Sequence, residues 1–256
     1  MDENLVSIIM PAYNSQRFIG ETIQSVQAQT YPNWELLITD DCSVPEVELV
    51  VSSYSKLDPR VKYFKLKENS GPAVARNNSI ANAKGRYLAF LDSDDLWMPE
   101  KLKTQLDFMQ TKGCHFSYTY YQRMKEDGVR YSYINECPDS LNYNQLLRNT
   151  AISTLTVIVD RAKYKDVSLE KGWGYDDYVL WLDLLRQGGI ALCLPKSLAF
   201  YRVVESSVSS KKVRATKWVW RILREHENIN VFKSSYYISC FCINAFLKRT
   251  RLNFWI

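Results

Sequence analysis

Four consecutive residues in the first half of the chain carry oxygen atoms that could bind a cation: Asp92, Ser93, Asp94 and Asp95. They directly follow residues 87–91, an apolar run typical of a buried strand. Carboxylates this close together repel one another unless a positive charge lies among them. Because Mg²⁺ and Mn²⁺ are often held by one or two carboxylates plus phosphate oxygens, Asp94 and Asp95 are candidate metal ligands. Asp92 and Ser93 are candidate nucleotide contacts, since one carboxylate could take a ribose hydroxyl, although Ser93 or Asp95 could instead cap a helix.

Polar and aromatic residues also follow two earlier apolar runs, residues 5–10 and 34–39. The candidate nucleotide contacts at these two places are Pro11, Ala12, Tyr13, Asn14 and Asp41. The ring of Tyr13 could stack on a nucleobase, and the carboxylate of Asp41 could accept the imide N–H of a uracil. The alternative is an aromatic ring at a strand end and a solvated acidic turn. The chain contains neither GxGxxG nor GxxxxGK[ST], which argues against a dinucleotide site and a P-loop.

Arg76 is a further candidate, because it follows Gly71 and Pro72, where a helix is expected to begin. If that helix packs on the same sheet, Arg76 faces the edge at which the acidic residues lie. A planar guanidinium matches the oxygens of a diphosphate, so Arg76 is predicted to lie near one. A solvated surface arginine is the alternative.

The elements that must bring these residues together alternate along the first part of the chain. Apolar runs predict strands over residues 5–10, 34–39, 61–66 and 87–91, and helical spacing predicts helices over residues 15–29, 47–54 and 73–83. This alternation predicts an α/β protein with a mostly parallel sheet and helices on both faces. Ligands of such sheets bind beyond the carboxyl ends of the strands, which is where the candidate residues fall.

The second part of the chain has a mixed pattern. We expect helices over residues 99–112 and 178–187, a strand over 116–123, and short strands over 154–159 and 190–194. One or two amphipathic helices are expected in the tail. The predicted organisation is a domain over residues 1–210, with a nucleotide-binding half (1–98) and an acceptor half (99–210), followed by a basic amphipathic helical tail (211–256).

Charge is distributed unevenly along the 256 residues. The chain has a formal net charge of +5, but from residue 211 onward ten Lys and Arg residues face two Glu residues, so residues 1–210 are mildly acidic. Aromatic residues are interleaved with the basic ones in the tail, which fits a helix lying on an anionic membrane surface. A helix packed on the domain, or a homodimer contact, is the alternative. The acidic body has no basic groove, so no nucleic-acid partner is expected.

Cysteine and histidine usage indicates a reducing compartment. The six cysteines form no CxxC pair, and with two histidines in the chain a zinc site is not expected. The first residues are acidic where a signal peptide is basic, and residues 234–247 are too short for a transmembrane helix, which needs about 20 residues. We therefore expect a cytoplasmic protein, peripheral on the inner face of the cytoplasmic membrane.

Five segments together resemble the family 2 glycosyltransferases of GT-A fold: residues 6–14 (VSIIMPAYN), 29–35 (QTYPNWE), 40–43 (DDCS), 69–77 (NSGPAVARN) and 90–95 (FLDSDD). They occur in the order and spacing of that family, and the likeness extends over roughly residues 4–210. It is greatest to bacterial cell-surface polysaccharide transferases, including teichuronic-acid and O-antigen enzymes. The resemblance implies a Rossmann-like central sheet flanked by helices, a UDP-sugar as donor, and a divalent metal, Mn²⁺ or Mg²⁺.

The resemblance also implies roles for residues already singled out. Pro11, Tyr13 and Asp41 would hold the uridine, and Arg76 would lie near the base or the diphosphate. Asp92 and Asp94 would form the DxD pair of the family, with Asp94 or Asp95 reaching the metal.

A sixth segment, residues 174–182 (GYDDYVLWL), resembles the family's ED-x-x-LWL element, whose second acidic residue is the general base. The resemblance implies that Asp177 is the base, supported by Trp181 and by Asp176, which replaces the more usual glutamate. A base that takes the acceptor's hydroxyl proton, opposite a leaving diphosphate neutralised by the metal, gives inversion in one displacement. The alternative is a helix that begins with acidic residues and buries Trp181 in the core.

Residues 201–209 (YRVVESSVS) resemble the tyrosine- and arginine-rich segment that precedes the tail in the family. Arg202 is expected to help order the closed site. Many relatives have a histidine where Val204 stands, so no metal or phosphate contact is transferred to that position.

The function expected from these features is inverting transfer of a sugar from a UDP-sugar to a hydroxyl group. The acceptor would be a glycan or a polyprenyl-diphosphate-linked sugar in O-antigen, capsule or teichuronic-acid synthesis. A catalytically silent protein of the same fold that binds sugar nucleotides or membranes is the alternative. A sugar nucleotidyltransferase would need a basic, glycine-rich loop after the first strand, and residues 11–15 are not one.

Overall fold

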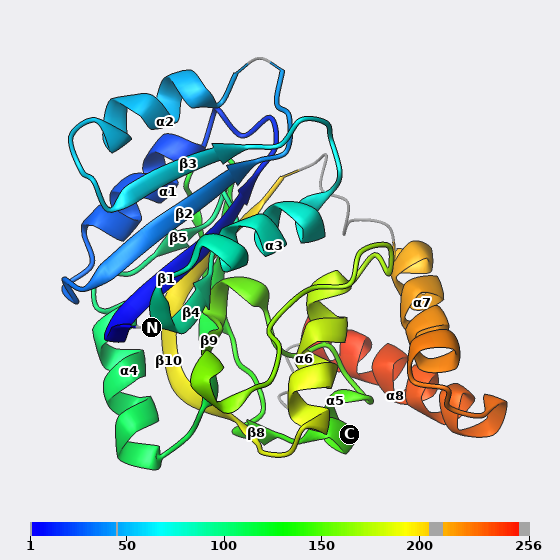
Figure 1. The fold of residues 1–256 in the computed structure, drawn as a ribbon. Helices are drawn as coiled ribbons and strands as arrows, with labels where there is room; N and C mark the ends of the chain where they lie inside the picture. The colour runs from blue at the N-terminus through cyan, green and yellow to red at the C-terminus, as the bar shows by residue number, and fades with distance from the viewer. Residues whose placement is uncertain (1, 45, 205–211, 251–256) are drawn as a thin grey trace.

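A mixed β-sheet runs through the molecule and is flanked by helices (Figure 1). The computed structural model describes residues 2–44, 46–204 and 212–250. Within these residues the strands are β1 (Asp2–Ala12), β2 (Trp34–Asp40), β3 (Val61–Lys65), β4 (Gly85–Phe90), β5 (Leu96–Trp97), β6 (Phe116–Lys125), β7 (Arg130–Asn135), β8 (Ser140–Leu141), β9 (Ile158–Asp160) and β10 (Ala191–Val203). Their order in the sheet is β3-β2-β1-β4-β9-β6-β10-β5, with β7 paired to β6 and β8 paired to β10.

The helices of the body lie between these strands in the sequence. They are α1 (Ile19–Gln27), α2 (Glu48–Ser55), α3 (Pro72–Asn82), α4 (Lys101–Lys112), α5 (Tyr143–Leu146) and α6 (Asp176–Arg186), with 3-10 turns at Thr154–Thr156 and Arg161–Lys163. α3 begins as its sequence predicts, with Gly71 at a φ of +93° and Pro72 in the first turn.

The first four long strands form a parallel block with β1 between β2 and β4. Ile8, Ile9 and Met10 of β1 are fully buried, because helices cover both faces of this block. Ile9 packs in a core shared with α3 and α6, whereas Ile8 and Met10 pack in a core shared with α1, α2 and α4. The alternation of these side chains between the two faces fixes the register of β1. Because β1, β2 and β4 are parallel, their carboxyl ends reach the same edge of the sheet.

The second half of the sheet is built around β6 and β10, which run parallel to each other. The short strand β9 lies antiparallel between β4 and β6 and joins the two halves. The predicted α/β class and its mostly parallel sheet are confirmed. The expected strand over residues 154–159 begins only at Ile158, because the three residues from Thr154 form a 3-10 turn. The strand expected over residues 190–194 continues to Val203 as the long strand β10.

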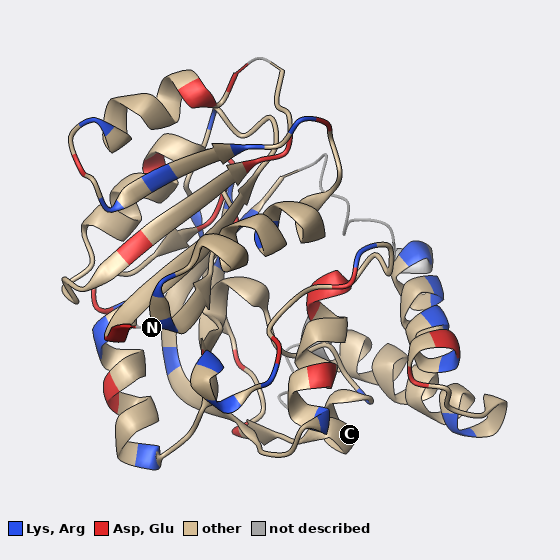
Figure 2. Cartoon of the chain, viewed as in Figure 1, with Lys and Arg blue, Asp and Glu red and all other residues tan. Residues whose placement is uncertain are grey.

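The tail helices are α7 (Lys212–Arg221) and α8 (Val231–Thr250), joined by a π-helical turn (Ile222–His226). Figure 1 places α7 beside the segment that leads into α6, and Figure 2 shows Lys and Arg residues along α7. Val219, Ile222 and Leu223 are buried in the core that contains α6, so this part of the tail packs on the body. No helix in the described ranges is long and apolar enough to cross a membrane. Residues 205–209 of the predicted tyrosine- and arginine-rich segment lie outside the described residues.

Candidate active site

The predicted nucleotide contacts after β1 and β2 lie in two loops that are hydrogen-bonded to each other. Ala12 is paired with Asp40 at the ends of the two strands. Beyond them, the backbone N–H of Asn14 donates to the Ser43 hydroxyl at 2.9 Å, and the Asn14 side chain accepts from the Val44 N–H at 2.9 Å. These bonds hold Asn14 at a φ of +50°. The preceding Tyr13 is 54% exposed, so its ring is presented at the edge of the sheet.

Asp41 is buried, and both of its carboxylate oxygens accept backbone hydrogen bonds. The N–H groups of Ser70 and Gly71 donate to them at 2.7 and 2.8 Å. The side chain therefore fixes the loop that opens α3. Each carboxylate oxygen can accept a second hydrogen bond, so a uracil N–H could share this group with the backbone. The predicted uracil contact stays a prediction.

Arg76 of α3 lies among carboxylates from two different parts of the chain. Its Nη2 atom donates to Asp92 Oδ1 at 2.5 Å, and the side chain is almost fully buried. Burial alone lowers the pKa of Arg76, but Asp92, Asp177 and Asp176 together outweigh that effect and raise it. The guanidinium is thus placed between the end of β4 and the start of α6, the two segments that carry the predicted donor-side and acceptor-side acids.

Asp94 and Asp95 follow β4 in a turn that excludes much of the solvent. Burial first, and then the neighbouring Asp92, raise the pKa of Asp94 to about 6. Burial, Asp94 and Asp92 raise the pKa of Asp95 well above its usual range. Asp95 Oδ1 accepts the backbone N–H of Arg202 at 2.8 Å, and Oδ2 is buried with no hydrogen-bond partner in the described part of the chain. This crowding of acids in a poorly hydrated turn fits a group that binds a cation.

A divalent ion at this turn would need ligands from outside the protein. Among the described residues, one group of three acidic or histidine side chains has its ligand atoms within 4.8 Å of one another, and it is Asp183, His226 and Glu227, not the acids after β4. The acids after β4 fit an ion held by one or two carboxylates and completed by phosphate oxygens, as is common for Mg²⁺. The predicted ligands Asp94 and Asp95 stay candidates, and the structure does not separate them.

Arg202 of β10 ties the acidic turn to the rest of the fold. Besides the backbone bond to Asp95, its Nε donates to the Asp94 carbonyl at 2.7 Å and its Nη2 donates to Glu21 at 2.7 Å. The guanidinium is buried and stacks over the ring of Phe18, with 4.6 Å between the guanidinium carbon and the ring centroid. Arg202 therefore fixes the position of the turn through its backbone as well as its side chain. Ser93, in the same turn, is buried and its carbonyl accepts the Thr22 hydroxyl at 3.0 Å.

Asp176 and Asp177 occupy the first turn of α6 but have different partners. Asp176 Oδ1 accepts the backbone N–H groups of Trp173 and Gly174 at 2.8 and 3.2 Å, and burial raises its pKa. Asp177 is half-buried, and its Oδ2 accepts the hydroxyl of Thr154. Asp176 thus shapes the segment before the helix, whereas Asp177 is oriented by the hydroxyl of Thr154 and by the backbone N–H of Tyr178, which donates to its Oδ1 at 2.9 Å.

Trp181 lies one turn further along α6 and is buried beneath the site. Its ring packs against Phe90 and Phe116, with ring centroids 5.2 and 5.4 Å apart. Because Phe90 is the last residue of β4, this packing fixes α6 relative to the strand that carries the acidic turn. Thr154 was not among the predicted residues: it lies in a segment read as a strand, and no motif marks it.

Comparison with known proteins identifies the family. The model of the family described as Glycosyl transferase family 2 matches residues 7–168. A protein of Bacillus subtilis (strain 168) with the provisional name teichuronic acid biosynthesis glycosyltransferase TuaG is 41% identical over 245 residues, 96% of this chain and 97% of the relative. WfgD of Escherichia coli, named as a UDP-Glc:alpha-D-GlcNAc-diphosphoundecaprenol beta-1,3-glucosyltransferase, is 38% identical over 224 residues, 87% of each chain.

Two solved structures share the fold at low sequence identity. Residues 1–349 of S. aureus TarS, in complex with UDP-GlcNAc, superpose with a TM-score of 0.69 at 22% identity, covering 88% of this chain and 67% of TarS. The mannosyltransferase PcManGT of Pyrobaculum calidifontis, in complex with GDP-Man and Mn²⁺, gives a TM-score of 0.70 at 16% identity, covering 93% of this chain and 70% of that one. The predicted GT-A fold is confirmed. Because the family model spans more than half of the chain and TuaG is alike over nearly its whole length, this chain belongs to glycosyl transferase family 2.

Proposed function

We propose that this chain transfers a sugar from a UDP-sugar to a hydroxyl of a glycan or a polyprenyl-diphosphate-linked acceptor, with inversion, in the synthesis of a cell-surface polysaccharide. The observation that carries the proposal is the position of Arg76, bonded to Asp92 and within electrostatic reach of Asp177. It brings a diphosphate-binding group between a cation-binding turn and a carboxylate suited to be a base. The names of TuaG and WfgD connect relatives to teichuronic acid and to a diphosphoundecaprenol acceptor, which supports this class of product.

The donor half of the proposed site is residues 1–98. Tyr13 stacks on the uracil, and Asn14, Pro11 and Ala12 line the nucleoside. Asp41 accepts the uracil imide N–H while it keeps its two backbone bonds. Arg76 lies by the diphosphate, and Asp92 and Ser93 complete the contacts at the end of β4.

The proposed metal, Mn²⁺ or Mg²⁺, is held by Asp94 or Asp95 of the DxD segment. The buried Asp95 Oδ2, which has no partner in the described residues, and the raised pKa values of both acids support a cation at this turn. Bound there, the ion would supply positive charge to the leaving diphosphate. Because the diphosphate would supply further oxygen ligands to the ion, one or two carboxylates from the protein are enough to hold it.

Asp177 is the proposed general base, in the acceptor half over residues 99–210. Its Oδ2 accepts from the hydroxyl of Thr154 and its Oδ1 accepts the backbone N–H of Tyr178 at 2.9 Å, and these two bonds fix the orientation of the carboxylate. The base takes the proton of the acceptor hydroxyl as the sugar–phosphate bond breaks, and a single carboxylate on that side gives one displacement with inversion. Asp176 and Trp181 support it by fixing the first turn of the helix.

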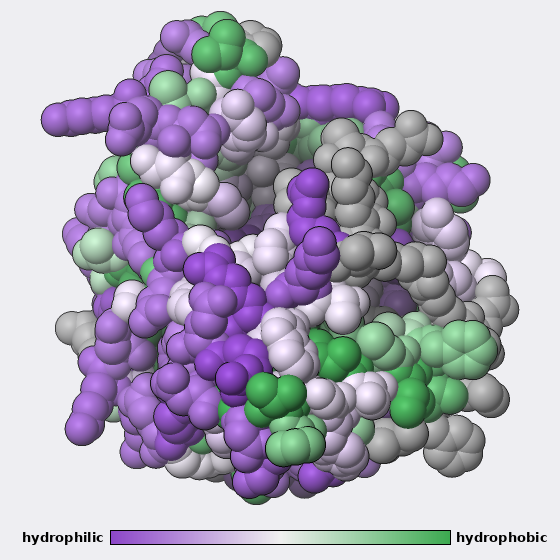
Figure 3. Space-filling model, turned by 90° about the vertical axis from the view of Figure 1, so that its right-hand side faces the viewer, coloured by the Kyte–Doolittle hydropathy of each residue, from purple (hydrophilic) through white to green (hydrophobic). Residues whose placement is uncertain are grey.

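The acceptor and the location are proposed from the tail. α8 leaves the aromatic side chains of Phe232, Tyr236 and Phe246 exposed, and the tail sequence adds Lys and Arg on the same segment. Figure 3 shows hydrophobic residues gathered beside hydrophilic ones on the side of the molecule where the tail lies. This composition fits a helix at the surface of an anionic bilayer, and it supports the proposal that the enzyme acts at the inner face of the cytoplasmic membrane beside a lipid-linked acceptor.

The test is UDP release from a set of UDP-sugars, with Mn²⁺ or Mg²⁺, in the presence and absence of a GlcNAc-diphospholipid acceptor. We expect metal-dependent release that rises with acceptor, from at least one UDP-sugar. Neither UDP binding nor release with any of them would overturn the proposal. UDP binding without transfer to any acceptor would instead indicate the silent sugar-nucleotide-binding protein.

A further inference from the structure

The segment Gly172–Tyr175, immediately before the two acids of α6, is contacted by the tail at every position. Arg221 contacts Gly172 and Trp173, His226 contacts Trp173, and Trp218 contacts Gly174 and Tyr175. The sequence predicts a tail that lies on a membrane surface, with packing on the domain or a dimer contact as the alternative. Its contacts with four consecutive residues next to the proposed base point to a different role.

Trp218 makes the tightest of these contacts, because its indole lies directly on the backbone of Gly174. A Cβ atom added to Gly174 would be 2.3 Å from Trp218 Cδ2, and Gly174 also has a φ of +84°. The same indole meets the ring of Tyr175 edge-on, with centroids 5.5 Å apart. The sequence thus provides a glycine at the one position where the indole leaves no room for a side chain.

Arg221 and His226 hold the other end of the segment. Arg221 Nη1 donates to the Gly172 carbonyl at 2.9 Å, and its guanidinium carbon lies 4.8 Å from the centre of the Trp173 ring. The His226 ring packs edge-on against the same indole, at 5.3 Å between centroids. Trp173 is therefore enclosed by two side chains of the tail.

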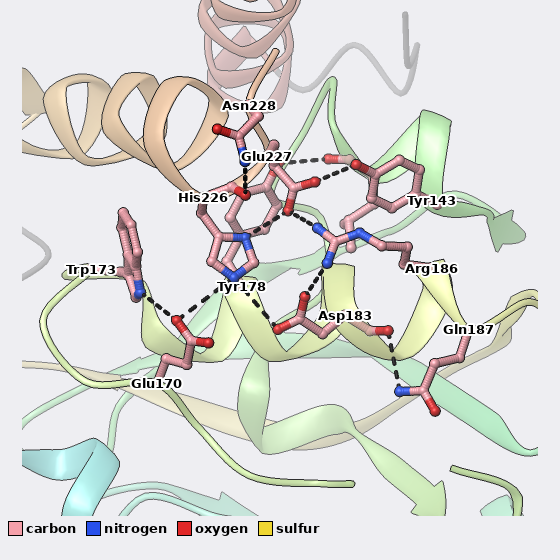
Figure 4. Close-up of polar contacts among 11 residues, drawn as sticks. Tyr143, Glu170, Trp173, Tyr178, Asp183, Arg186, Gln187, His226, Glu227 and Asn228 are labelled. Carbon is pink, nitrogen blue, oxygen red and sulfur yellow. Dashed lines mark hydrogen bonds and ion pairs between the residues drawn. The ribbon is translucent and has the colours of Figure 1, made fainter. Parts of the chain in front are cut away.

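The tail is fixed to α6 itself by a charged network around His226 (Figure 4). His226 Nδ1 lies 2.9 Å from Glu227 Oε1, and its Nε2 lies 3.7 Å from Asp183 Oδ2. Arg186 pairs with Glu227 at 2.5 Å and with Asp183 at 2.7 Å. Arg186 therefore bridges both carboxylates, and the bonds among Asp183, His226 and Glu227 join the tail to α6.

We propose that α7 is a positioning element for the acceptor side of the active site and that Trp218 is its central positioning residue. By pressing on Gly174, Trp218 keeps the N–H groups of Trp173 and Gly174 aimed at Asp176, and this fixes the helix turn from which Asp177 acts. The proposal rests on the role of Asp177 under the proposed function. It makes the tail part of the catalytic unit and not only a means of attachment.

The full-length variants Trp218→Ala and Trp218→Phe test this, with Trp220→Ala as a matched control. Trp220 is on the same helix but is exposed, and no ring contact joins it to the segment. With a GlcNAc-diphospholipid and a UDP-sugar that supports transfer by the wild type, we expect W218A to lower kcat by about ten- to a hundredfold while the donor KM and the UDP Kd stay within about twofold. W218F should recover most of the rate, W220A should match the wild type, and amide hydrogen exchange over residues 172–177 should speed up in W218A alone.

The exchange measurement keeps this inference separate from the proposed function. If the wild-type chain transfers no sugar, the proposed function fails, and exchange over residues 172–177 still decides whether Trp218 orders the segment. Unchanged exchange in W218A overturns the inference, as does an equal loss of kcat in W218A and W220A. If W218A misfolds and loses UDP binding, the variant Arg221→Ala replaces it in the test. This variant removes the bond to the Gly172 carbonyl, and its kcat and its amide exchange over residues 172–177 are measured in the same way.

Discussion

Arg76 and Asp92 form an ion pair of 2.5 Å between α3 and the end of β4, with the arginine almost entirely shielded from solvent. The pair joins a helix that begins beneath Asp41 to the turn that carries the acids Asp94 and Asp95. The guanidinium of Arg76 thus connects α3, whose N-terminal end is bonded to Asp41, with the acidic turn of the proposed donor site. The charge of Asp177, on the acceptor side, also acts on Arg76 and raises its pKa.

Replacement of Arg76 by lysine should weaken donor binding without unfolding the protein. Lysine keeps the charge opposite Asp92 but loses the planar fork that pairs with two oxygens at once. Because a hydrogen bond to a charged group is worth about 1.5–3 kcal/mol, the UDP Kd should rise about tenfold or more, as measured by calorimetry with Mn²⁺ present. Arg86→Lys, in the ion pair with Asp160 at the opposite end of β4, is the control and should bind UDP as the wild type does. Equal Kd values for R76K and the wild type would contradict the assignment.

Asp177→Asn should abolish transfer and spare donor binding. The amide is nearly isosteric and cannot take a proton, so kcat should fall about 10²–10⁴-fold while the UDP Kd is unchanged. Asp176→Ala should behave differently, because it removes the oxygen that accepts two backbone N–H groups: we expect it to reduce stability by about 0.5–2 kcal/mol in urea unfolding. Full transfer activity in D177N would show that another group is the base.

Removal of divalent metal should weaken UDP binding, and Asp94→Asn should make binding insensitive to metal. The proposed cation would offset repulsion among the acids after β4, so Mn²⁺ should tighten UDP binding in the wild type but much less in D94N. Calorimetric titrations with EDTA and with Mn²⁺ measure both. Asp127→Asn, in an exposed turn, controls for the loss of one negative charge. Binding that is the same in EDTA as in Mn²⁺ would argue against a metal in the donor site.

Lys101 should make the free energy of unfolding depend on pH above neutrality. Its ammonium is buried between Gln105 and the ring of Trp97, and burial lowers its pKa to about 7. Between about 7 and the ordinary value of 10.5, the unfolded chain binds a proton that the folded chain does not, so stability rises with pH across this window. Urea unfolding at pH 7, 8 and 9 should show this rise in the wild type and in Lys103→Met, an exposed neighbour, but not in Lys101→Met. Parallel pH profiles for the wild type and K101M would contradict it.

Gly174→Ala should destabilise the fold, and the part of the cost that comes from overlap with the indole should disappear when Trp218 is also removed. The left-handed backbone and the overlap with the indole each cost about 1–3 kcal/mol in an alanine variant. In G174A/W218A the overlap is absent and only the backbone cost remains, so the double-mutant cycle should give a clear coupling energy. Strictly additive losses would mean that the indole moves aside without cost.

Much of the donor half was predictable because its signals are local. A strand of buried apolar residues ends at each candidate site, and parallel strands bring their carboxyl ends together, so Tyr13, Asp41 and Asp92 were expected at one edge. The partners of these residues were not predictable. That Asp41 binds the N–H groups of Ser70 and Gly71, and that Asp92 pairs with Arg76, depends on how loops pack, which no periodicity encodes.

The acceptor side was predicted less completely, for the same physical reason. Asp177 was recognised from a motif, but Thr154, which orients it, lies 23 residues away in a segment read as a strand. The aromatic residues of the tail have the spacing of a membrane-surface helix, and composition alone does not distinguish that from a helix docked on its own domain. Trp218 contacts Gly174 and Tyr175 whereas Trp220 is exposed, and because both are tryptophans the sequence does not show which of them packs on the domain.

The enclosure of Gly172–Tyr175 by the tail limits which parts of these enzymes can be exchanged. The family model ends at residue 168, ahead of both the enclosed segment and the proposed base. A chimera joined between the loop and the tail would instead combine Gly174 from one parent with the tail of another, whose residue at the position of Trp218 need not fit against it. Recombination between relatives should therefore succeed when the join lies before the loop and carries loop, α6 and tail together as one inherited block.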